Sequence, residues 1–208
     1  VNIVPGAVDS VIIIPNSVIL STGSTQAFST IAYDAYGNLI SGALFVWTTN
    51  VGSVDFNGFF TAQTMPDIGT ITATNGSASG SADITVLVGA LHHTIITPDP
   101  ATIQAGTTQL FTATGYDLYN NQITGLSFAW TTNVGAVNSL GLFTAQTMSG
   151  SGIVTATSGA ITGTANVFVI PGSLDHITVT PDPATVVVGG TLLFTITAYD
   201  NYNNPLNG

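Results

Sequence analysis

The sequence predicts an all-β protein built from tandem β-sandwich repeats, and three observations carry this prediction. Residues 45–65 recur in closely similar form as residues 128–148, which sets a repeat period of 83 residues. Apolar and polar residues alternate along short runs that are rich in β-branched side chains and separated by turn residues. No segment has a convincing helical period, and the usual surface helix formers Lys, Arg and Glu are missing.

The period divides the 208 residues into two complete repeats and one fragment. Residues 1–4 correspond to the end of a preceding repeat's last strand, 5–87 to repeat 1, 88–170 to repeat 2, and 171–208 to an incomplete repeat 3. We expect repeat 3 to be completed in cis by a longer chain, or in trans by a strand from a neighbouring chain. Because the linkers hold only a few turn residues, we expect the repeats to form a semi-rigid rod.

The early strands follow from proline positions and from alternation. A first strand over residues 8–14 ends at Pro15, and a second short strand over 17–20 follows it. A strand broken in this way is typical of a sandwich edge where the chain crosses between sheets. The next predicted strand spans residues 25–34 and directs Phe28 and Ala32 toward the core.

The later strands complete a sandwich. The next strand carries Trp47, with Trp130 as its counterpart in repeat 2, and we place both at the centre of their cores. Strands over residues 69–75 and 82–88 direct Ile71 and Ile84 inward. About seven strands per repeat, with a tryptophan in a middle strand and no cysteine, indicate an immunoglobulin-like sandwich without a disulfide.

The order of motifs is also specific. Both complete repeats read W-T-T-N-x-G-x-V, then G-x-F-T-A, then G-x-x-T-A-T, then a strand ending in valine. This order resembles the bacterial immunoglobulin-like (Big) repeats of prokaryotic surface proteins. The segment AYD-x-Y-G/N-N, present at 198–204 as well, is similar to repeats of invasin- and intimin-type proteins. The resemblance implies a core and turns without catalytic residues.

The composition excludes several classes of partner. The chain has no Lys, Arg, Glu or Cys, and its ten acidic residues are all Asp. Binding to nucleic acid is not expected, because affinity for phosphate depends on Lys and Arg. Attraction to anionic membranes is excluded for a similar reason, and no apolar run is long enough to span a bilayer. Divalent cations remain possible partners for such a negative surface.

Aspartate-containing turns are the first candidate sites. Calcium prefers carboxylate and amide oxygens as ligands. Asp and Asn also stabilise turns by hydrogen bonding to their own backbone, so turn chemistry is the alternative reading. The residues concerned are Asp34, Asn38, Asp117, Asn121, Asp200 and Asn204.

Two other polar groups are weaker candidates. His92, His93 and His176 lie at the start of first strands, where a metal site is conceivable, although neighbours on a strand point to opposite faces. We expect polar residues of a repeat junction there instead. Asn75 begins the N-x-S sequon Asn75-Gly76-Ser77 and is a possible glycosylation site on a turn.

The functional hypothesis is structural. We expect these repeats to belong to an extracellular filament, sheath, S-layer-like coat or adhesin stalk on a cell surface, with copies of themselves or adjacent repeats as partners. The alternative is a carbohydrate- or receptor-binding module of an adhesin or secreted enzyme. An enzymatic role is not expected, because there is no paired-Glu arrangement, no G-x-S-x-G motif and no nucleotide fingerprint.

Overall fold

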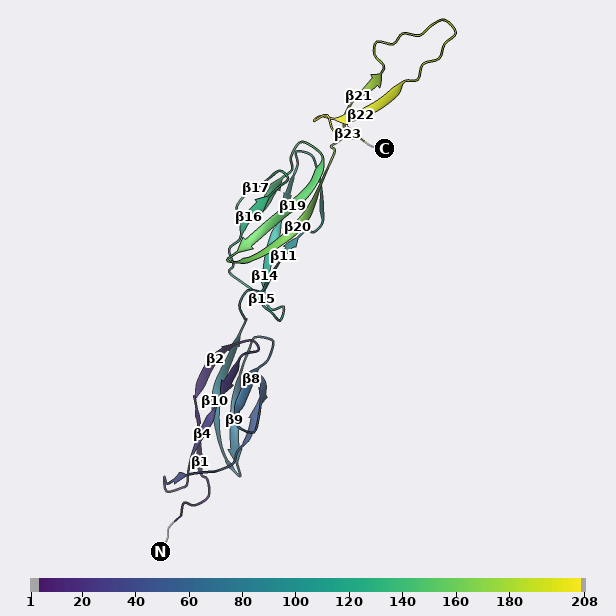
Figure 1. The fold of residues 1–208 in the computed structure, drawn as a ribbon. Coiled ribbons are helices and arrows are strands. Elements are labelled where there is room, and N and C mark those ends of the chain that lie inside the picture. The colour runs from purple at the N-terminus through teal and green to yellow at the C-terminus, as the bar shows by residue number, and fades with distance from the viewer. Residues whose placement is uncertain (1–3, 207–208) are drawn as a thin grey trace. The chain divides into compact units, whose positions relative to one another are not determined.

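The computed structural model describes residues 4–206, and every regular element there is a β-strand (Figure 1). The chain divides into two compact units. Unit 1 comprises Val1–His92 and Tyr116–Ile123, and unit 2 comprises His93–Gly115 and Thr124–Gly208. The chain therefore passes between the units three times, and a short segment of predicted repeat 2 belongs to unit 1. The predicted repeat boundaries stay a prediction, and of the predicted strand end at 1–4, residues 1–3 lie outside the described residues.

Ten strands lie within residues 5–87, the predicted repeat 1. They are β1 (Ser10–Ile14), β2 (Ser17–Ser21), β3 (Thr25–Ala27), β4 (Ser29–Tyr33), β5 (Leu39–Ile40), β6 (Val46–Thr49), β7 (Gly52–Val54), β8 (Phe59–Ala62), β9 (Asp67–Asn75) and β10 (Ala78–Leu87). The strand predicted over residues 25–34 is divided into two shorter strands, β3 and β4, which are interrupted at Phe28. The Phe28 N–H donates to the Gly58 carbonyl oxygen at 2.9 Å instead of continuing either ladder.

Unit 1 is a sandwich of two layers. One layer is the sheet β2-β10-β9-β6, in which β2 runs parallel to β10 and the other neighbours are antiparallel. The sheets β1-β4-β5 and β3-β8-β7 supply the strands of the opposite layer. Strands β1 and β2, which Pro15 separates, thus lie in different sheets, which confirms the predicted crossing. The arrangement is the predicted immunoglobulin-like, all-β fold.

The core of unit 1 lies between these layers. Phe28 and Phe60 meet edge to face, with ring centroids 6.2 Å apart. The predicted inward residues Ile71 and Ile84 are fully buried against them. Because the sequence has no Lys, Arg or Glu, apolar burial and backbone ladders hold the fold together.

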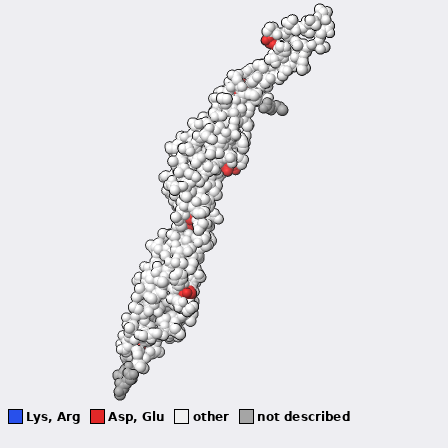
Figure 2. All heavy atoms as spheres, viewed as in Figure 1, with Lys and Arg blue, Asp and Glu red and all other residues white. Residues whose placement is uncertain are grey.

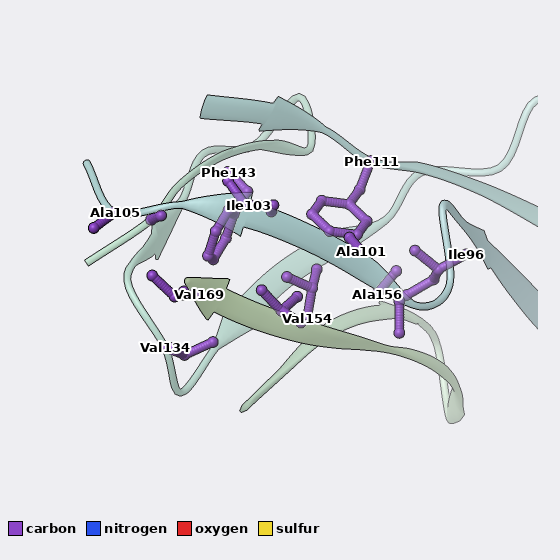
Figure 3. Packing of buried hydrophobic residues seen from close by; sticks show 13 residues of the cluster. Ile96, Ala101, Ile103, Ala105, Phe111, Val134, Phe143, Val154, Ala156 and Val169 are labelled. Carbon is purple, nitrogen blue, oxygen red and sulfur yellow. The ribbon is translucent and has the colours of Figure 1, made fainter. Parts of the chain in front are cut away.

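Unit 2 repeats this arrangement. Its strands, together with β15 of unit 1, are β11 (His93–Thr97), β12 (Ala101–Gln104), β13 (Thr108–Leu110), β14 (Thr112–Tyr116), β15 (Gln122–Ile123), β16 (Ala129–Thr132), β17 (Ala136–Val137), β18 (Leu142–Thr144), β19 (Gly150–Ser158) and β20 (Ile161–Ile170). Phe111 and Phe143 meet edge to face at 5.9 Å between centroids. Figure 3 shows Val154 and Ala156 pointing into the same cluster.

The predicted position of the tryptophans is wrong. Trp47 and Trp130 are only partly buried and pack against the margin of their clusters. Their strands, β6 and β16, are edge strands of the four-stranded sheets, so one side of each ring lacks a neighbouring strand. The phenylalanine pairs occupy the centres instead.

Predicted repeat 3 contains a three-stranded sheet without an opposing layer among the described residues. It contains β21 (Leu174–Thr180), β22 (Thr195–Asp200) and β23 (Pro205–Leu206) (Figure 1). Phe194 is 51% exposed, whereas its counterpart Phe111 is 1% exposed. Residues 184–188, which correspond to β12 at the repeat period, form no strand.

Candidate functional site

An aspartate closes the turn after β4. The Oδ1 atom of Asp34 accepts hydrogen bonds from the backbone N–H groups of Tyr36 (2.9 Å) and Asn38 (2.8 Å). Its Oδ2 atom accepts from the Gly6 N–H (2.9 Å) and from Asn38 Nδ2 (3.0 Å). The carboxylate thus ties the turn to the segment that precedes β1, and its side chain is buried.

The same turn occurs twice more. Asp117 accepts from the N–H groups of Tyr119 and Asn121 and, at 2.9 Å, from that of Gly89. Asp200 makes the corresponding bonds within unit 2, and they come from Tyr202 N–H, Asn204 N–H, Asn204 Nδ2 and Gly172 N–H. Asp117 and Asp200 are almost completely buried. The structure therefore brings each predicted Asp together with its predicted Asn.

In unit 1 the Asp117 turn packs on the turn formed by residues 21–24 of predicted repeat 1, which we call its seat. Thr22 Oγ1 donates to Asp117 Oδ2 at 2.9 Å, and Asn121 Nδ2 donates to the Thr64 carbonyl oxygen at 2.7 Å. The ring of Tyr119 occupies the space that a side chain at Gly23 would need. Beside this contact lies an open cavity of about 410 Å³.

Unit 2 contains the equivalent seat. Asn204 Nδ2 donates to the Thr147 carbonyl oxygen at 2.7 Å, and Asn204 Oδ1 accepts from the Ser149 N–H at 2.9 Å. The Tyr202 ring covers Gly106 in the same way that the Tyr119 ring covers Gly23. Ala105 takes the place of the threonine hydroxyl found in unit 1, so the ring and the asparagine are the shared elements.

The turn geometry lowers the pKa of each carboxyl group. Hydrogen bonds from the Asn38 side chain and then from the Gly6 amide lower the pKa of Asp34 to about 2. For Asp200, burial opposes ionisation, but hydrogen bonds from Asn204, Gly172 and Tyr202 outweigh it and lower the pKa to about 2. The pKa of Asp117 is likewise lowered, against burial, by Asn121, Gly89 and Thr22. No basic side chain contributes, as the absence of blue in Figure 2 illustrates.

These shifts predict a loss of stability in acid. A carboxyl group whose pKa is lower in the folded state stabilises the fold above its unfolded pKa, and this stabilisation is lost as pH falls through the folded pKa. We expect the free energy of unfolding, measured by urea titration, to decline from about pH 4 to about pH 2. Asp34→Asn should show a smaller decline over that interval. Equal stability of the unmodified chain at pH 5 and pH 2 would contradict this assignment.

The donors around these carboxylates favour the turn reading over the calcium reading. Calcium requires oxygen ligands, whereas N–H groups, asparagine Nδ2 atoms and one hydroxyl group point at the aspartate oxygens. Residues 4–206 contain no group of three or more His, Cys, Asp or Glu placed to hold a metal ion. We expect the melting temperature to be unchanged by EDTA, and a lowering that calcium reverses would restore the calcium hypothesis.

The other candidate residues are dispersed. His176 Nδ1 lies 3.0 Å from Asp175 Oδ2, and its ring stacks on Tyr199. His92 and His93 are on a different segment, where the N–H of His92 donates to the Tyr116 carbonyl oxygen.

The sequon lies at the end of β9. Asn75 is the last residue of the strand, and its Nδ2 donates to the Leu44 carbonyl oxygen at 2.8 Å. Glycosylation at Asn75 stays a prediction.

The seat under Tyr119 predicts unequal effects at two glycines. Gly23 and Gly42 both have positive φ angles (71° and 76°), so alanine is strained at either position. Only at Gly23 would the new Cβ displace a tyrosine ring, since no heavy atom lies within 4 Å of a Cβ at Gly42. Gly23→Ala should therefore lower the free energy of unfolding by about 1 kcal/mol more than Gly42→Ala. Equal losses in urea titrations would show that the ring contact contributes nothing.

Sequence reasoning missed the seat itself. Gly23, Gly106 and Gly189 recur at the repeat period, as do Gly6, Gly89 and Gly172, and this recurrence was a usable signal. Thr22 carried none, because neither later repeat has threonine at its position.

No protein-family model matches the chain. Ice-binding protein 1 of Shewanella frigidimarina is 29% identical over 133 residues, which cover 62% of this chain and 15% of that protein's length. The chain thus spans a small part of this relative.

Three solved structures align with most of this chain at low sequence identity. The Escherichia coli adhesin FdeC aligns with 99% of this chain and 79% of its own (22% identity, TM-score 0.49). Invasin, described as a bacterial integrin-binding protein, aligns with 95% of this chain and 47% of its own (20% identity, TM-score 0.47). The S-layer protein rSbsC aligns with 98% of this chain and 32% of its own (18% identity, TM-score 0.40).

Residues 4–206 contain no helix long and apolar enough to cross a membrane.

Proposed function

We propose that the chain is a structural, non-catalytic array of Big-type immunoglobulin-like repeats from an extracellular surface protein. Its role is that of a semi-rigid spacer in a filament, coat or adhesin stalk. The observation that carries this proposal is the seated turn. Asn121 and Asn204 donate to the carbonyl oxygens of Thr64 and Thr147 at the same distance, 2.7 Å, in two different units. A contact that recurs in this way is part of the sequence repeat itself, and a spacer built from repeats needs such a contact.

The chemistry of the surface supports the same role. A chain without Lys and Arg offers no site for trypsin-like proteases, and a chain without Cys has no thiol to oxidise. Both properties suit exposure outside a cell.

The exposed hairpin β21–β22 is the place where strand exchange would act. Ile177 and Ile196 are more than half exposed there, and a sandwich requires a second layer over such side chains. Strands supplied by the same chain or by a neighbouring molecule would cover them. The proposed filament would use the second route.

Immunolabelling tests the proposed location. Antibodies against the chain are applied to intact and to permeabilised cells of the source organism, with a cytoplasmic protein as the control antigen. We expect equal labelling of intact and permeabilised cells, and loss of the signal after protease treatment of intact cells. Labelling that requires permeabilisation would refute a surface role.

A glycan array tests the alternative of a binding module. We expect no signal from the chain, because the proposed spacer role requires no carbohydrate ligand. A signal that Tyr119→Ala removes would favour carbohydrate binding over a spacer role.

A further inference from the structure

The chain holds two sulfur atoms, and both belong to side chains at the surface. Met65 and Met148 are the only methionines, and the sequence has no cysteine. Their side chains are 67% and 70% exposed. They are separated by the repeat period of 83 residues, so each complete repeat carries one exposed thioether at the same position.

The loop that carries each methionine is fixed by a glutamine of the same loop. Met65 lies between β8 and β9, and Gln63 Nε2 donates to the Met65 carbonyl oxygen at 3.1 Å. Met148 lies between β18 and β19, and Gln146 Nε2 donates to the Met148 carbonyl oxygen at 3.0 Å. The two loops therefore hold the methionine backbone in the same way, while the side chain is left in solvent.

Each methionine also adjoins the contact with a seated turn. The residue before it, Thr64 or Thr147, supplies the carbonyl oxygen that accepts from an asparagine Nδ2 at 2.7 Å. Both exposures are those with the turn in place, because the Asp117 turn belongs to unit 1 and the Asp200 turn to unit 2. A seated turn therefore leaves the thioether open to solvent in both units.

We propose that Met65 and Met148 are the oxidation sites of the folded chain, which peroxides convert to methionine sulfoxide. In this reaction the thioether sulfur attacks one oxygen of the peroxide, so that an S–O bond forms and the O–O bond breaks. The sulfur loses two electrons, and hydrogen peroxide is reduced to water, or an organic hydroperoxide to its alcohol. The proposal goes beyond the spacer role and does not depend on it.

Exposure and chemistry both select these two residues. Susceptibility to oxidation follows the accessibility of the sulfur, and no thiol competes for the oxidant. The indole rings of Trp47 and Trp130 are partly buried against the core clusters. We therefore expect peroxide to add one oxygen atom to each methionine and none elsewhere.

The folded structure should tolerate the product. Oxidation converts an apolar side chain into a polar one, which disrupts a core but costs little where the side chain already lies in water. The hydrogen bonds that fix the loop join the Gln63 or Gln146 side chain to a backbone carbonyl oxygen, and none involves the sulfur. The seated turn should consequently survive oxidation.

Intact-protein mass spectrometry of the folded chain in hydrogen peroxide at neutral pH tests the proposal. We expect the mass to rise by two oxygen atoms, at a rate within about threefold of that of N-acetylmethionine amide in the same solution. Met65→Leu and Met148→Leu should each take up one oxygen atom, and the double variant none. The two methionine sulfoxide reductases, one for each sulfoxide epimer, should together restore the original mass.

Ile71→Met supplies a buried thioether as the matched control. Ile71 is fully buried, and the exchange nearly conserves the volume of the side chain. In the background that lacks both native methionines, this sulfur should stay unoxidised until urea unfolds the chain. Oxidation as fast as at the native sites would overturn the proposal, because exposure would then not select the sites.

The seated turn provides a second readout. The melting temperature and the amide exchange of Tyr119 and Asn121 should be the same before and after oxidation. Oxygen uptake that occurs only in urea, or oxidation that removes protection from these two amides, would overturn the proposal.

Discussion

Replacing Phe60 with alanine is expected to lower the free energy of unfolding of unit 1 by about 3–5 kcal/mol. Phe60 is fully buried and lies edge to face against Phe28, so the truncation removes an aromatic pair and leaves a cavity between the layers. The closely packed core contains no network of charged side chains that could compensate for the lost packing. Urea titration followed by circular dichroism measures the loss.

Phe56 provides a control of the same residue type. It lies a few residues earlier in the chain and is 84% exposed, so Phe56→Ala should change the free energy by no more than about 0.5 kcal/mol. Comparable losses for the two variants would mean that the core is not centred on the phenylalanine pair.

The second large effect is expected at the seated turn. Asp117→Ala removes the acceptor of the Thr22 hydroxyl and of the Gly89, Tyr119 and Asn121 amides. Buried donors left without a partner are costly, so we expect unit 1 to lose about 2–4 kcal/mol of stability. Differential scanning calorimetry should show a lower melting temperature.

Asp83 supplies the matched control for this variant. Its side chain is exposed on β10, and Asp83→Ala should change the stability by no more than about 0.5 kcal/mol. Equal melting temperatures for Asp117→Ala and Asp83→Ala would show that the seated turn contributes nothing to the stability of the fold.

The fold could be predicted from the sequence because alternation fixes which side chains face inward. Ile71 and Ile84 alternate with polar neighbours, and the structure buries both. The crossing at Pro15 also followed from local chemistry, since proline has no N–H to donate to a ladder.

What the sequence did not reveal depends on contacts distant along the chain. Trp47 is predicted at the centre of the core, but its strand lies at a sheet edge, and strand order is a tertiary property. The bond between Thr22 and Asp117 joins residues 95 positions apart, and repetition cannot reveal it because Thr22 does not recur.

The candidate site was predictable in part for a similar reason. Asp34 and Asn38 are close enough in sequence for turn chemistry to pair them, so the sequence predicts the turn as one of two alternatives. Seating of the later turns requires a preceding repeat, and no local pattern encodes it.

Residue-resolved amide exchange in the Phe60→Ala variant tests most directly the claim that each turn is part of the repeat on which it is seated. We predict that the Tyr119 and Asn121 amides lose protection together with those of β9 and β10, while β19 and β20 keep theirs. Retention of protection at Tyr119 and Asn121 alongside β19 and β20 would contradict the claim and assign the turn to unit 2.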